Sequence, residues 1–492
     1  MILFLIGHTY KYESEKVCRI FFPTEKIIFA DALSSSLPED SKRVLTEIIN
    51  RGEYTDYICK AEIDGKSEQY TVTEKTDKED FIEENSLAAA MVKALSNLTG
   101  IVPPWGILTG VRPSKLMRKL IAANGEENAQ NIFHSELMVS GKKTQLAFNV
   151  AKAESGAIAL SKPNSFSLYI SIPFCPTRCS YCSFVSHSVA QAKKLIPEYV
   201  ELLCEEIRRT AAIAKALSLK LETVYFGGGT PTSLSADEIK KLLFAVNDNF
   251  GAAFCREFTV EAGRPDTIDE EKLRALKNAG VNRISVNPQT FSDEVLKNIG
   301  RQHKSSDTEE KFMLARSIGF DNINMDLIAG LTGDTLEGFN FSLNKALSLS
   351  PENITVHTLA LKRAARMSTE NEQTESACLI SDMVELSNSS LYKNGYLPYY
   401  MYRQSKSLGN LENVGWTKPG RDCLYNIYMM EETHTVLACG AGAVTKLKEP
   451  NGENIERIYN FKYPYEYISR FSELTDRKKY IEEFYTKGKT DG

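Results

Sequence analysis

Long apolar runs are missing from this sequence. No stretch approaches the roughly 18 apolar residues that a membrane-spanning helix requires, so we expect no membrane span. The run Met1–Ile6 is apolar, but it is shorter than the apolar core of a secretory signal and no basic lead precedes it. We therefore expect a soluble chain that resides in the cytoplasm.

An excess of one charge is missing as well. The 59 Lys and Arg residues are balanced by 64 Asp and Glu residues, which argues against bulk attraction to nucleic acid or to an anionic membrane. A disulfide framework is not expected from the ten cysteines, because the cytoplasm keeps thiols reduced. Seven of these cysteines are scattered singly and are expected to be inert thiols. The other three crowd into one short segment, where we look for chemistry.

The length of 492 residues, with 42% hydrophobic residues, is enough for more than one domain. Residues 1–160 mix strand-like and helix-like runs, which predicts a separate α+β domain of unknown role. Its basic segment around Arg112 and Arg118 is either a solvated face or a clamp for an anionic ligand. The runs predict strands at 17–22, 57–63 and 69–73 and helices at 81–98 and 114–123.

Strand-like and helix-like runs alternate from residue 161 onward. This rhythm indicates parallel βαβ units with right-handed crossovers. Six such units predict an α/β fold, an incomplete (β/α)6 barrel over residues 161–395, with the active site at the carboxyl ends of the strands. Residues 396–492 are rich in Gly, Tyr and Asn and are expected to form an extension that closes the active site. Strands are predicted at 168–172, 223–226, 258–260, 283–286, 323–328 and 354–359, and helices at 198–216, 236–249, 270–279, 308–318, 335–349 and 374–393.

Cys175, Cys179 and Cys182 follow the first predicted barrel strand. Thiolates are soft ligands that suit iron–sulfur clusters or zinc. A cluster that only transfers electrons normally uses four cysteines, so three would leave one iron open to a chelating ligand. Zinc completed by His187 is the alternative, but zinc ligands usually come in two close pairs separated by a longer gap. The spacing favours a [4Fe–4S] cluster.

Glycines and polar residues mark the ends of the next predicted strands. The run Gly227-Gly228-Gly229 exposes backbone amides and carbonyls to which a ligand can come close. Glu261, Gln289 and Asp326 end the third, fourth and fifth strands, and Arg301 lies between the last two. One such residue is commonly an ordinary cap. Together they predict a ring of polar groups that grips a small ligand.

These features resemble the radical S-adenosylmethionine (SAM) superfamily, whose cysteine loop carries an aromatic residue, here Tyr181, before the last cysteine. More narrowly, the chain is similar to the oxygen-independent coproporphyrinogen III oxidase group in the segments 169–175, 227–232, 286–291 and 324–331. The Gly-Val-Arg-Pro segment at 110–113 is similar to the HemZ-like branch. The resemblance implies that Cys175, Cys179 and Cys182 hold the cluster and that Tyr169, Gly228 and Glu261 contact the SAM on it. It further implies a second SAM, held by Tyr181, Gly229, Thr230, Gln289, Arg301, Asp326 and Ala360.

The resemblance also implies an activity. A coproporphyrinogen dehydrogenase of heme biosynthesis converts two propionates of its tetrapyrrole to vinyls, giving protoporphyrinogen IX, and takes electrons from a donor such as flavodoxin or ferredoxin. Catalytic contacts are then expected from Tyr169, Arg178 and Arg301, because the substrate carries four carboxylates that arginine binds well. Arg112 and Arg118 are further candidates. The reaction needs no general base, which suits the absence of an evident His/Asp pair in the sequence.

Two other functions stay open. Phe184, two residues after the third cysteine, makes the loop similar to the heme-chaperone branch of the superfamily, although that branch has a histidine in a tail motif where this chain reads Tyr-Asn-Ile-Tyr-Met-Met. A different radical SAM enzyme, such as one that degrades heme anaerobically, is the second alternative. A lone histidine is more often a packed or surface residue than a heme ligand. The histidines that would serve a heme-binding role are His187, His303, His357 and His434.

Overall fold

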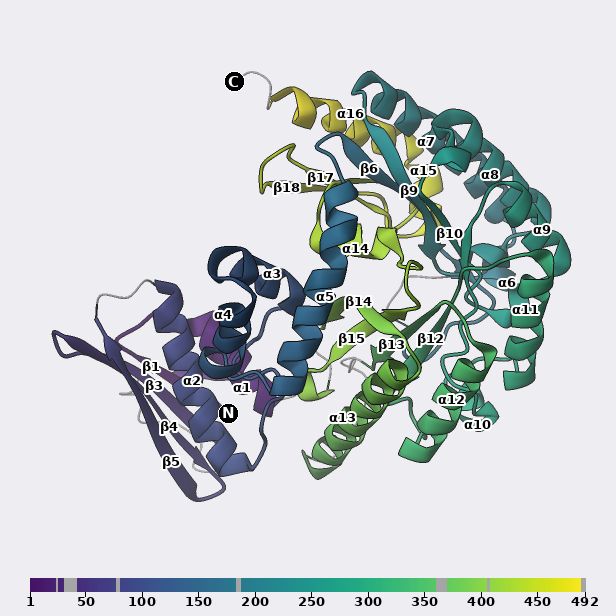
Figure 1. The fold of residues 1–492 in the computed structure, drawn as a ribbon. Coiled ribbons are helices and arrows are strands. Elements are labelled where there is room, and N and C mark those ends of the chain that lie inside the picture. The colour runs from purple at the N-terminus through teal and green to yellow at the C-terminus, as the bar shows by residue number, and fades with distance from the viewer. Residues whose placement is uncertain are drawn as a thin grey trace. The chain divides into compact units, whose positions relative to one another are not determined.

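The computed structural model divides the chain into two compact units (Figure 1). The first comprises Met1–Ala151, Ala360–Ser381 and Met401–Glu412, and the second comprises Lys152–Leu359, Asp382–Tyr400 and Asn413–Gly492. The structure describes residues 1–23, 25–30, 42–76, 80–182, 187–359, 370–404 and 408–487. The roles expected for residues 1–160, 161–395 and 396–492 stay a prediction.

The amino-terminal part of the first unit is a five-stranded sheet with two helices. The strand order is β2-β1-β3-β4-β5, and β1 runs parallel to both of its neighbours while β3, β4 and β5 are antiparallel. The elements are β1 Ile2–Ile6, α1 Lys11–Phe21, β2 Ile28–Ala30, β3 Arg43–Asn50, β4 Tyr54–Ile63, β5 Lys66–Lys75 and α2 Asp80–Thr99.

One predicted strand in this part is wrong. Residues 17–22 form the second half of α1 and the residue after it. Val17, Cys18 and Phe21 are buried, and their spacing of one, three and four residues places them on one helix face. The predicted strands at 57–63 and 69–73 are confirmed as parts of β4 and β5, and the predicted helix at 81–98 as part of α2.

Residues 105–107 belong to the core of the first unit. Trp105 is buried, and its indole Nε1 donates a hydrogen bond of 2.8 Å to Glu412, which also forms a 2.6 Å ion pair with the buried Lys143. The guanidinium of Arg403 donates to the carbonyl of Leu108 at 2.8 Å. Polar groups buried this deeply need such partners. The helices that follow are α3 Pro113–Asn124, α4 Glu126–Asn131, the π-helix η1 Ile132–Glu136 and α5 Gly141–Leu160.

The second unit is built on an open sheet of parallel strands. In β6 Ser165–Ile172, β9 Lys220–Gly228, β10 Glu257–Glu261, β11 Arg283–Ser285, β12 Ile323–Ala329 and β13 Asn353–Thr358, each strand runs parallel to the next. The helices lie along the outer side of the curved sheet (Figure 1). They are α7 Ile196–Ala216, α8 Ala236–Phe250, α9 Glu270–Asn278, α10 Asp293–Asn298, α11 Ser305–Ile318 and α12 Leu336–Leu349. This confirms the predicted incomplete barrel.

The carboxyl-terminal region adds strands to both edges of this sheet. β16 Thr435–Cys439 pairs in parallel with β6 and is followed by the antiparallel β17 Val444–Lys448 and β18 Ile455–Tyr459. At the other edge, β15 Glu412–Thr417 runs antiparallel to β13, and β14 Leu397–Arg403 lies beyond it. The helices of this region are α13 Glu370–Lys393, α14 Leu424–Glu431, α15 Pro464–Ser469 and α16 Phe471–Lys487.

A buried carboxylate fixes the turn after β16. Glu206 of α7 accepts hydrogen bonds from the backbone of Gly440 at 2.7 Å and from the hydroxyl of Tyr467 at 2.6 Å, and pairs with Lys478 at 2.9 Å. Ser171 of β6 donates to the carbonyl of Ala441 in the same turn at 2.8 Å. The end of β6, from which the cysteine loop departs, is therefore held by a fully partnered buried network.

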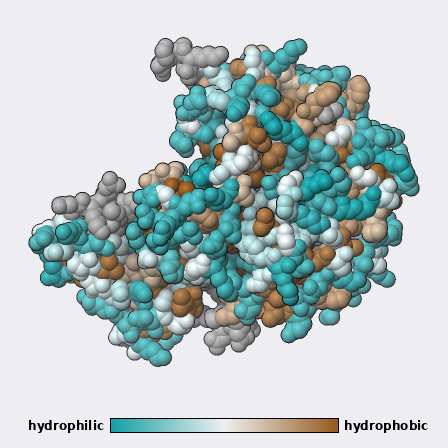
Figure 2. Space-filling view, in the orientation of Figure 1, coloured by the Kyte–Doolittle hydropathy of each residue, from teal (hydrophilic) through white to brown (hydrophobic). Residues whose placement is uncertain are grey.

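Hydrophilic residues cover most of the face seen in Figure 2, and apolar residues form separate groups on it. Among the helices in the described residues, none combines the length and the apolar character needed to cross a membrane.

Candidate active site

The cysteine loop begins at the carboxyl end of β6. Cys175 ends the short strand β7 Phe174–Cys175, which pairs with β8 His187–Ser188. The loop is fastened to the segment before Arg301 by Ser180, whose amide donates to the carbonyl of Ile299 at 3.1 Å, and by Thr177, whose hydroxyl donates to the carbonyl of Gly300 at 2.9 Å. The side chains of Cys175, Cys179 and Cys182 are all half-buried.

The glycine run packs the end of β9 against the base of this loop. The amide of Gly229 donates to Ile172 at 2.7 Å, and the amide of Thr230 donates to Phe174 at 2.8 Å. A Cβ on Gly229 would lie 2.5 Å from the carbonyl oxygen of Phe174, and Gly228 has a φ of +106° that favours glycine. The expectation that the glycine run leaves its amides exposed to a ligand is therefore wrong at Gly229, whose amide is used in packing.

Three tyrosine rings stack beside the glycine run. The centroid of the Tyr169 ring in β6 lies 6.2 Å from that of Tyr225 in β9 and 6.1 Å from that of Tyr425 in α14. The ring centroids of Tyr225 and Tyr425 are 4.4 Å apart, and all three rings are nearly parallel. A Cβ on Gly227 would lie 3.2 Å from the hydroxyl of Tyr169 and 3.3 Å from the carboxyl carbon of Glu261. The absence of a side chain at Gly227 thus lets β9 pass close to both predicted SAM contacts. Tyr225 and Tyr425 were not predicted.

Glu261 has an unusual protonation state for a carboxyl group. Burial raises its pKa to about 7, and the hydroxyl of Tyr225, which donates to Glu261 Oε1 at 2.6 Å, counters only part of this effect. Burial also raises the pKa of Tyr169, and the nearby charge of Glu261 adds to the rise. Glu261 can therefore hold or release a proton near neutral pH.

Gln289, which follows β11, lies next to Asp326, which is in the middle of β12 and not at its end as predicted. The amide of Gln289 donates to the carbonyl of Asp326 at 2.9 Å, and Gln289 is buried with a left-handed φ of +66°. Such a conformation is uncommon outside glycine and is typical of functional sites. The side chain of Asp326 accepts from Asn324 at 2.8 Å and lies 3.8 Å from Nε2 of His357.

The structure thus contains a His/Asp pair that was not evident in the sequence. Burial alone would raise the pKa of Asp326, but the hydrogen bond and positive charge of His357 outweigh it and hold the pKa below its ordinary value. His357 lies two strand positions beyond Thr355, the register partner of Asp326. Because the two residues are 31 positions apart in the sequence, only the pairing of β12 with β13 brings them together.

Arg301 and Tyr181 form a buried pair beside the cysteine loop. Arg301 donates to the carbonyl of Asn287 at 2.8 Å and to the hydroxyl of Tyr181 at 3.3 Å. The charges of Tyr181 and Cys179 raise the pKa of Arg301 despite its burial. Arg178, the third predicted catalytic residue, is exposed on the loop. Ala360 and Phe184 lie outside the described residues.

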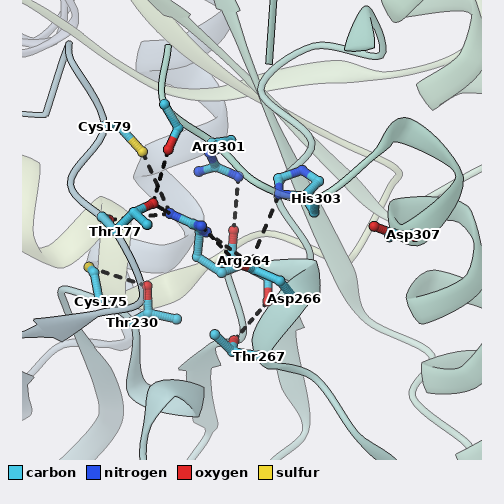
Figure 3. A network of polar contacts seen from close by, with 12 residues as sticks. Cys175, Thr177, Cys179, Thr230, Arg264, Asp266, Thr267, Arg301, His303 and Asp307 are labelled. Carbon is cyan, nitrogen blue, oxygen red and sulfur yellow. Dashed lines mark hydrogen bonds and ion pairs between the residues drawn. The ribbon is translucent and has the colours of Figure 1, made fainter. Parts of the chain in front are cut away.

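Two charged residues that the sequence did not single out lie against the loop (Figure 3). Arg264 is 3% exposed and forms a two-pronged ion pair with Asp266, at 2.9 and 2.8 Å. Its NH1 atom lies 3.2 Å from Thr177 Oγ1 and 3.8 Å from Cys179 Sγ. The available signal was the position of Arg264 just after the third strand, three residues beyond Glu261.

Residues 169–346 match the family model of the radical SAM superfamily. Over 434 residues the chain is 39% identical to the oxygen-independent coproporphyrinogen-III oxidase-like protein HemZ of Bacillus subtilis (strain 168), a match that covers 86% of this chain and 87% of HemZ. The chain belongs to the radical SAM superfamily, in its HemN/HemZ group.

The chain is also similar to a heme chaperone and to a coproporphyrinogen III oxidase. The heme chaperone HemW of Bacillus subtilis (strain 168) is 44% identical over 197 residues, which cover 40% of this chain and 51% of HemW. The coproporphyrinogen III oxidase HemN of Escherichia coli has a similar fold, with a TM-score of 0.52 and 23% identity over 66% of this chain and 73% of HemN. The radical SAM fold of the second unit is thus common to proteins named as oxidases and as chaperones.

Radical SAM proteins use a [4Fe–4S] cluster and SAM. Within the described residues, no three His, Cys, Asp or Glu side chains are gathered at metal-binding distance. The three thiols nevertheless share one short loop. Cys175 Sγ lies 3.5 Å from the hydroxyl of Thr230, and Arg264 donates toward Cys179 Sγ. Donors directed at sulfur favour the thiolate that a cluster requires. The ligand set fits the cluster by its chemistry and its position.

The four histidines considered for heme binding differ in accessibility. His434 is buried and its two nitrogens contact the hydroxyls of Ser161 at 2.6 Å and Ser167 at 2.8 Å. His303 is buried behind Asp266, and burial together with the charge of Arg301 lowers its pKa to about 4. His187 and His357 are half-buried. These last two histidines of the radical SAM unit remain for the heme-binding alternative.

Proposed function

We propose that this chain is an oxygen-independent coproporphyrinogen III oxidase, a radical SAM oxidoreductase that forms protoporphyrinogen IX. The observation that carries the proposal is the proximity of three predicted site residues in the sheet that bears the cysteine loop: Asp326 of β12 receives a hydrogen bond from the amide of Gln289, and its charge acts on Glu261 at the end of β10. The likeness to HemZ over most of both chains supports it. The fold shared with HemN is consistent with it.

The residues proposed to hold the cofactors come from the same strand ends. Cys175, Cys179 and Cys182 would bind the cluster, and Tyr169, Gly228 and Glu261 would bind the SAM beside it. When bound, the cluster and SAM supply the one-electron chemistry that removes a hydrogen atom from substrate. We propose that Tyr181, Gly229, Thr230, Gln289, Arg301, Asp326 and Ala360 bind a second SAM.

Substrate binding requires cations because coproporphyrinogen III carries four carboxylates. Arg178 is exposed and makes no hydrogen bond or ion pair with other described residues. Its guanidinium is therefore available for two-pronged binding of a propionate. Arg301 is buried and engaged with the carbonyl of Asn287, so its proposed task is to position Tyr181 and the loop beside the ligands.

Each propionate loses one hydrogen atom, one molecule of carbon dioxide and one further electron, and the side chain becomes a vinyl. The hydrogen atom comes from the carbon next to the pyrrole and leaves an unpaired electron there. This electron and one electron of the carbon–carboxylate bond form the new double bond, and the other electron of that bond departs as carbon dioxide is released. No step removes a proton from substrate. Burial raises the pKa of Glu261 to about 7, so this carboxyl group can carry a proton beside the proposed SAM site.

The electron that starts each cycle must come from outside the chain. We propose a small redox protein such as flavodoxin or ferredoxin as the donor and an acceptor of similar potential for the electron released. Any such donor must supply single electrons, because the chemistry proceeds in one-electron steps.

Parallel anaerobic incubations test this proposal. The protein is reconstituted with iron and sulfide, supplied with SAM and a reductant, and given either coproporphyrinogen III or heme. We expect vinyl-bearing products from coproporphyrinogen III, their loss in Cys179→Ala, and no consumption of heme. Consumption of heme with methylated products would instead assign the chain to anaerobic heme degradation.

A heme-carrying role is the second candidate, favoured by the 44% identity to HemW over 197 residues. It predicts stable heme uptake through His187 or His357 without conversion of coproporphyrinogen III. An absorption titration with heme, repeated with His187→Ala and His357→Ala, separates this role from the oxidase. Tight uptake that falls in either variant, with no vinyl formation, would replace the proposal.

A further inference from the structure

Arg264 contacts the cysteine loop directly in the polar network of Figure 3. Its NH1 atom lies 3.8 Å from the sulfur of Cys179, 3.2 Å from the hydroxyl of Thr177 and 3.4 Å from the carbonyl of Thr177. One guanidinium nitrogen therefore faces both a proposed cluster ligand and the backbone between two of the three ligands.

The guanidinium is held rigidly from the opposite side. Asp266 takes two hydrogen bonds from it, through Nε at 2.9 Å and NH2 at 2.8 Å. The backbone of Arg264 is fixed in turn, because its carbonyl accepts from the hydroxyl of Thr267 at 2.7 Å. Because the guanidinium group is planar and its Nε and NH2 atoms are bound to Asp266, only NH1 can point at the cysteine loop. This orientation is therefore imposed and does not depend on the thiol.

The charges around Cys179 do not cancel. Arg264 and Arg301 are both buried cations near this sulfur, and Asp266 is the acidic partner on the far side of Arg264. His303, which lies 4.0 Å from Asp266, is kept neutral by burial and by Arg301. The surroundings of Cys179 thus carry a net positive charge in a region that solvent reaches poorly, where charges act strongly.

We propose that Arg264 is a positioning residue that raises the reduction potential of the cluster through Cys179. Reduction adds a negative charge to a group that thiolates and sulfides already make anionic. A fixed cation and a hydrogen bond to a ligand sulfur stabilise the reduced form more than the oxidised form. The cluster then accepts an electron from a weaker reductant. This inference rests on the proposed cluster site.

The test is a potentiometric titration of the reconstituted protein, followed by electron paramagnetic resonance in the absence of substrate. In Arg264→Gln we expect the equilibrium constant for cluster reduction to fall about tenfold, which for one electron is a fall of about 59 mV in midpoint potential. Arg264→Lys keeps the positive charge but loses the planar guanidinium group, so the midpoint potential should fall by less in this variant than in Arg264→Gln. The matched control is Arg316→Gln, because Arg316 also pairs with a carboxylate, Glu352, at 2.8 Å and lies at the end of α11 that leads into the amino end of β12.

Asp266→Asn distinguishes electrostatic tuning from a merely structural role. This substitution breaks the same ion pair as Arg264→Gln but removes the opposite charge, so the midpoint potential should rise. A shift of both variants in the same direction, or an unchanged potential in Arg264→Gln with full iron and sulfide content, would overturn the inference. If the unaltered protein takes up no cluster, the proposed function itself fails, and the two failures are thereby distinguished.

Discussion

At the scale of single residues, Glu261 is a carboxyl group whose surroundings oppose its ionisation. Its pKa is about 7 in the folded chain, against an ordinary value of 4.5, mainly because it is buried. The folded state therefore keeps a proton over a pH range in which the unfolded state has lost it. Stability from this group is fully present below about pH 4.5 and is lost as the pH rises through 7.

We expect the free energy of unfolding of the cofactor-free protein to fall by up to about 3 kcal/mol through Glu261 between pH 4.5 and 8. Glu261→Gln should remove this part of the pH dependence and stabilise the protein at pH 8. Urea denaturation at both pH values measures the effect, with the exposed Glu337→Gln as control. An identical pH dependence in Glu261→Gln and the unaltered protein would contradict the assigned protonation state.

Residues at strand ends could be predicted from the sequence because position along a βα unit implies position at one edge of the sheet. Glu261 does end β10, whereas Gln289 lies beyond β11 and Asp326 inside β12, and the site roles of all three stay a prediction. The left-handed backbone of Gln289 and the contact of Asp326 with His357 depend on strand pairing, which the sequence does not contain. Arg264 was missed because a charged residue directly after a strand is usually a solvent-exposed residue at the strand end.

At the scale of elements, the junction of β9 with the cysteine loop depends on glycine. A Cβ on Gly229 would overlap the carbonyl oxygen of Phe174 at 2.5 Å, so the strand would have to move away from the loop. We expect Gly229→Ala to destabilise the protein by about 1–3 kcal/mol and to lower cluster content. Thermal unfolding and iron analysis measure both effects.

Gly156→Ala is the matched control for this substitution. Gly156 lies inside α5, and a Cβ there would meet nothing within 4 Å. Alanine should therefore stabilise the helix by roughly 0.5–1 kcal/mol. Equal behaviour of the two variants would contradict the packing role of Gly229.

Through the stacking of Tyr425 on Tyr169, α14 supports one of the residues proposed to bind SAM. Within the described residues, the buried hydroxyl of Tyr425 has no hydrogen-bond partner. Tyr425→Phe keeps the stacked ring and should retain stability and SAM affinity, whereas Tyr425→Ala should lose about 3–5 kcal/mol and bind SAM more weakly. Equilibrium dialysis with SAM tests this prediction. Unchanged SAM affinity in Tyr425→Ala would show that the ring does not support Tyr169.

Elements with a strong local pattern could be predicted, and those defined by distant partners could not. The six barrel strands and their helices show alternation over many residues. β16 is only five residues long, and its place in the sheet depends on parallel pairing with β6, which lies far earlier in the chain. Residues 17–22 were mistaken for a strand because a short apolar run does not distinguish a strand from the buried face of a helix.

At the scale of the whole molecule, each unit is made from separate segments of the chain. The ion pair of Lys143 with Glu412 joins residues 269 positions apart within the first unit. Removing one partner of a buried pair leaves an uncompensated charge, so Lys143→Met should destabilise the protein by roughly 3–5 kcal/mol. Such a pairing could not be predicted, because nothing in the local sequence marks its partner.

The neighbouring Lys142→Met provides the control, because Lys142 is exposed. Its effect on the free energy of unfolding should stay within about 0.5 kcal/mol. Urea denaturation followed by fluorescence measures both variants. Similar losses in the two would mean that the buried pair does not stabilise the first unit.

The most direct test of the proposed oxidase follows the hydrogen atom that leaves the substrate. Coproporphyrinogen III deuterated on the propionate carbons next to the pyrroles is incubated anaerobically with the reconstituted protein, SAM and a reductant, and the 5′-deoxyadenosine is analysed by mass spectrometry. The proposed function predicts deuterium in 5′-deoxyadenosine in proportion to the vinyl groups formed. Unlabelled 5′-deoxyadenosine together with unchanged coproporphyrinogen would contradict it.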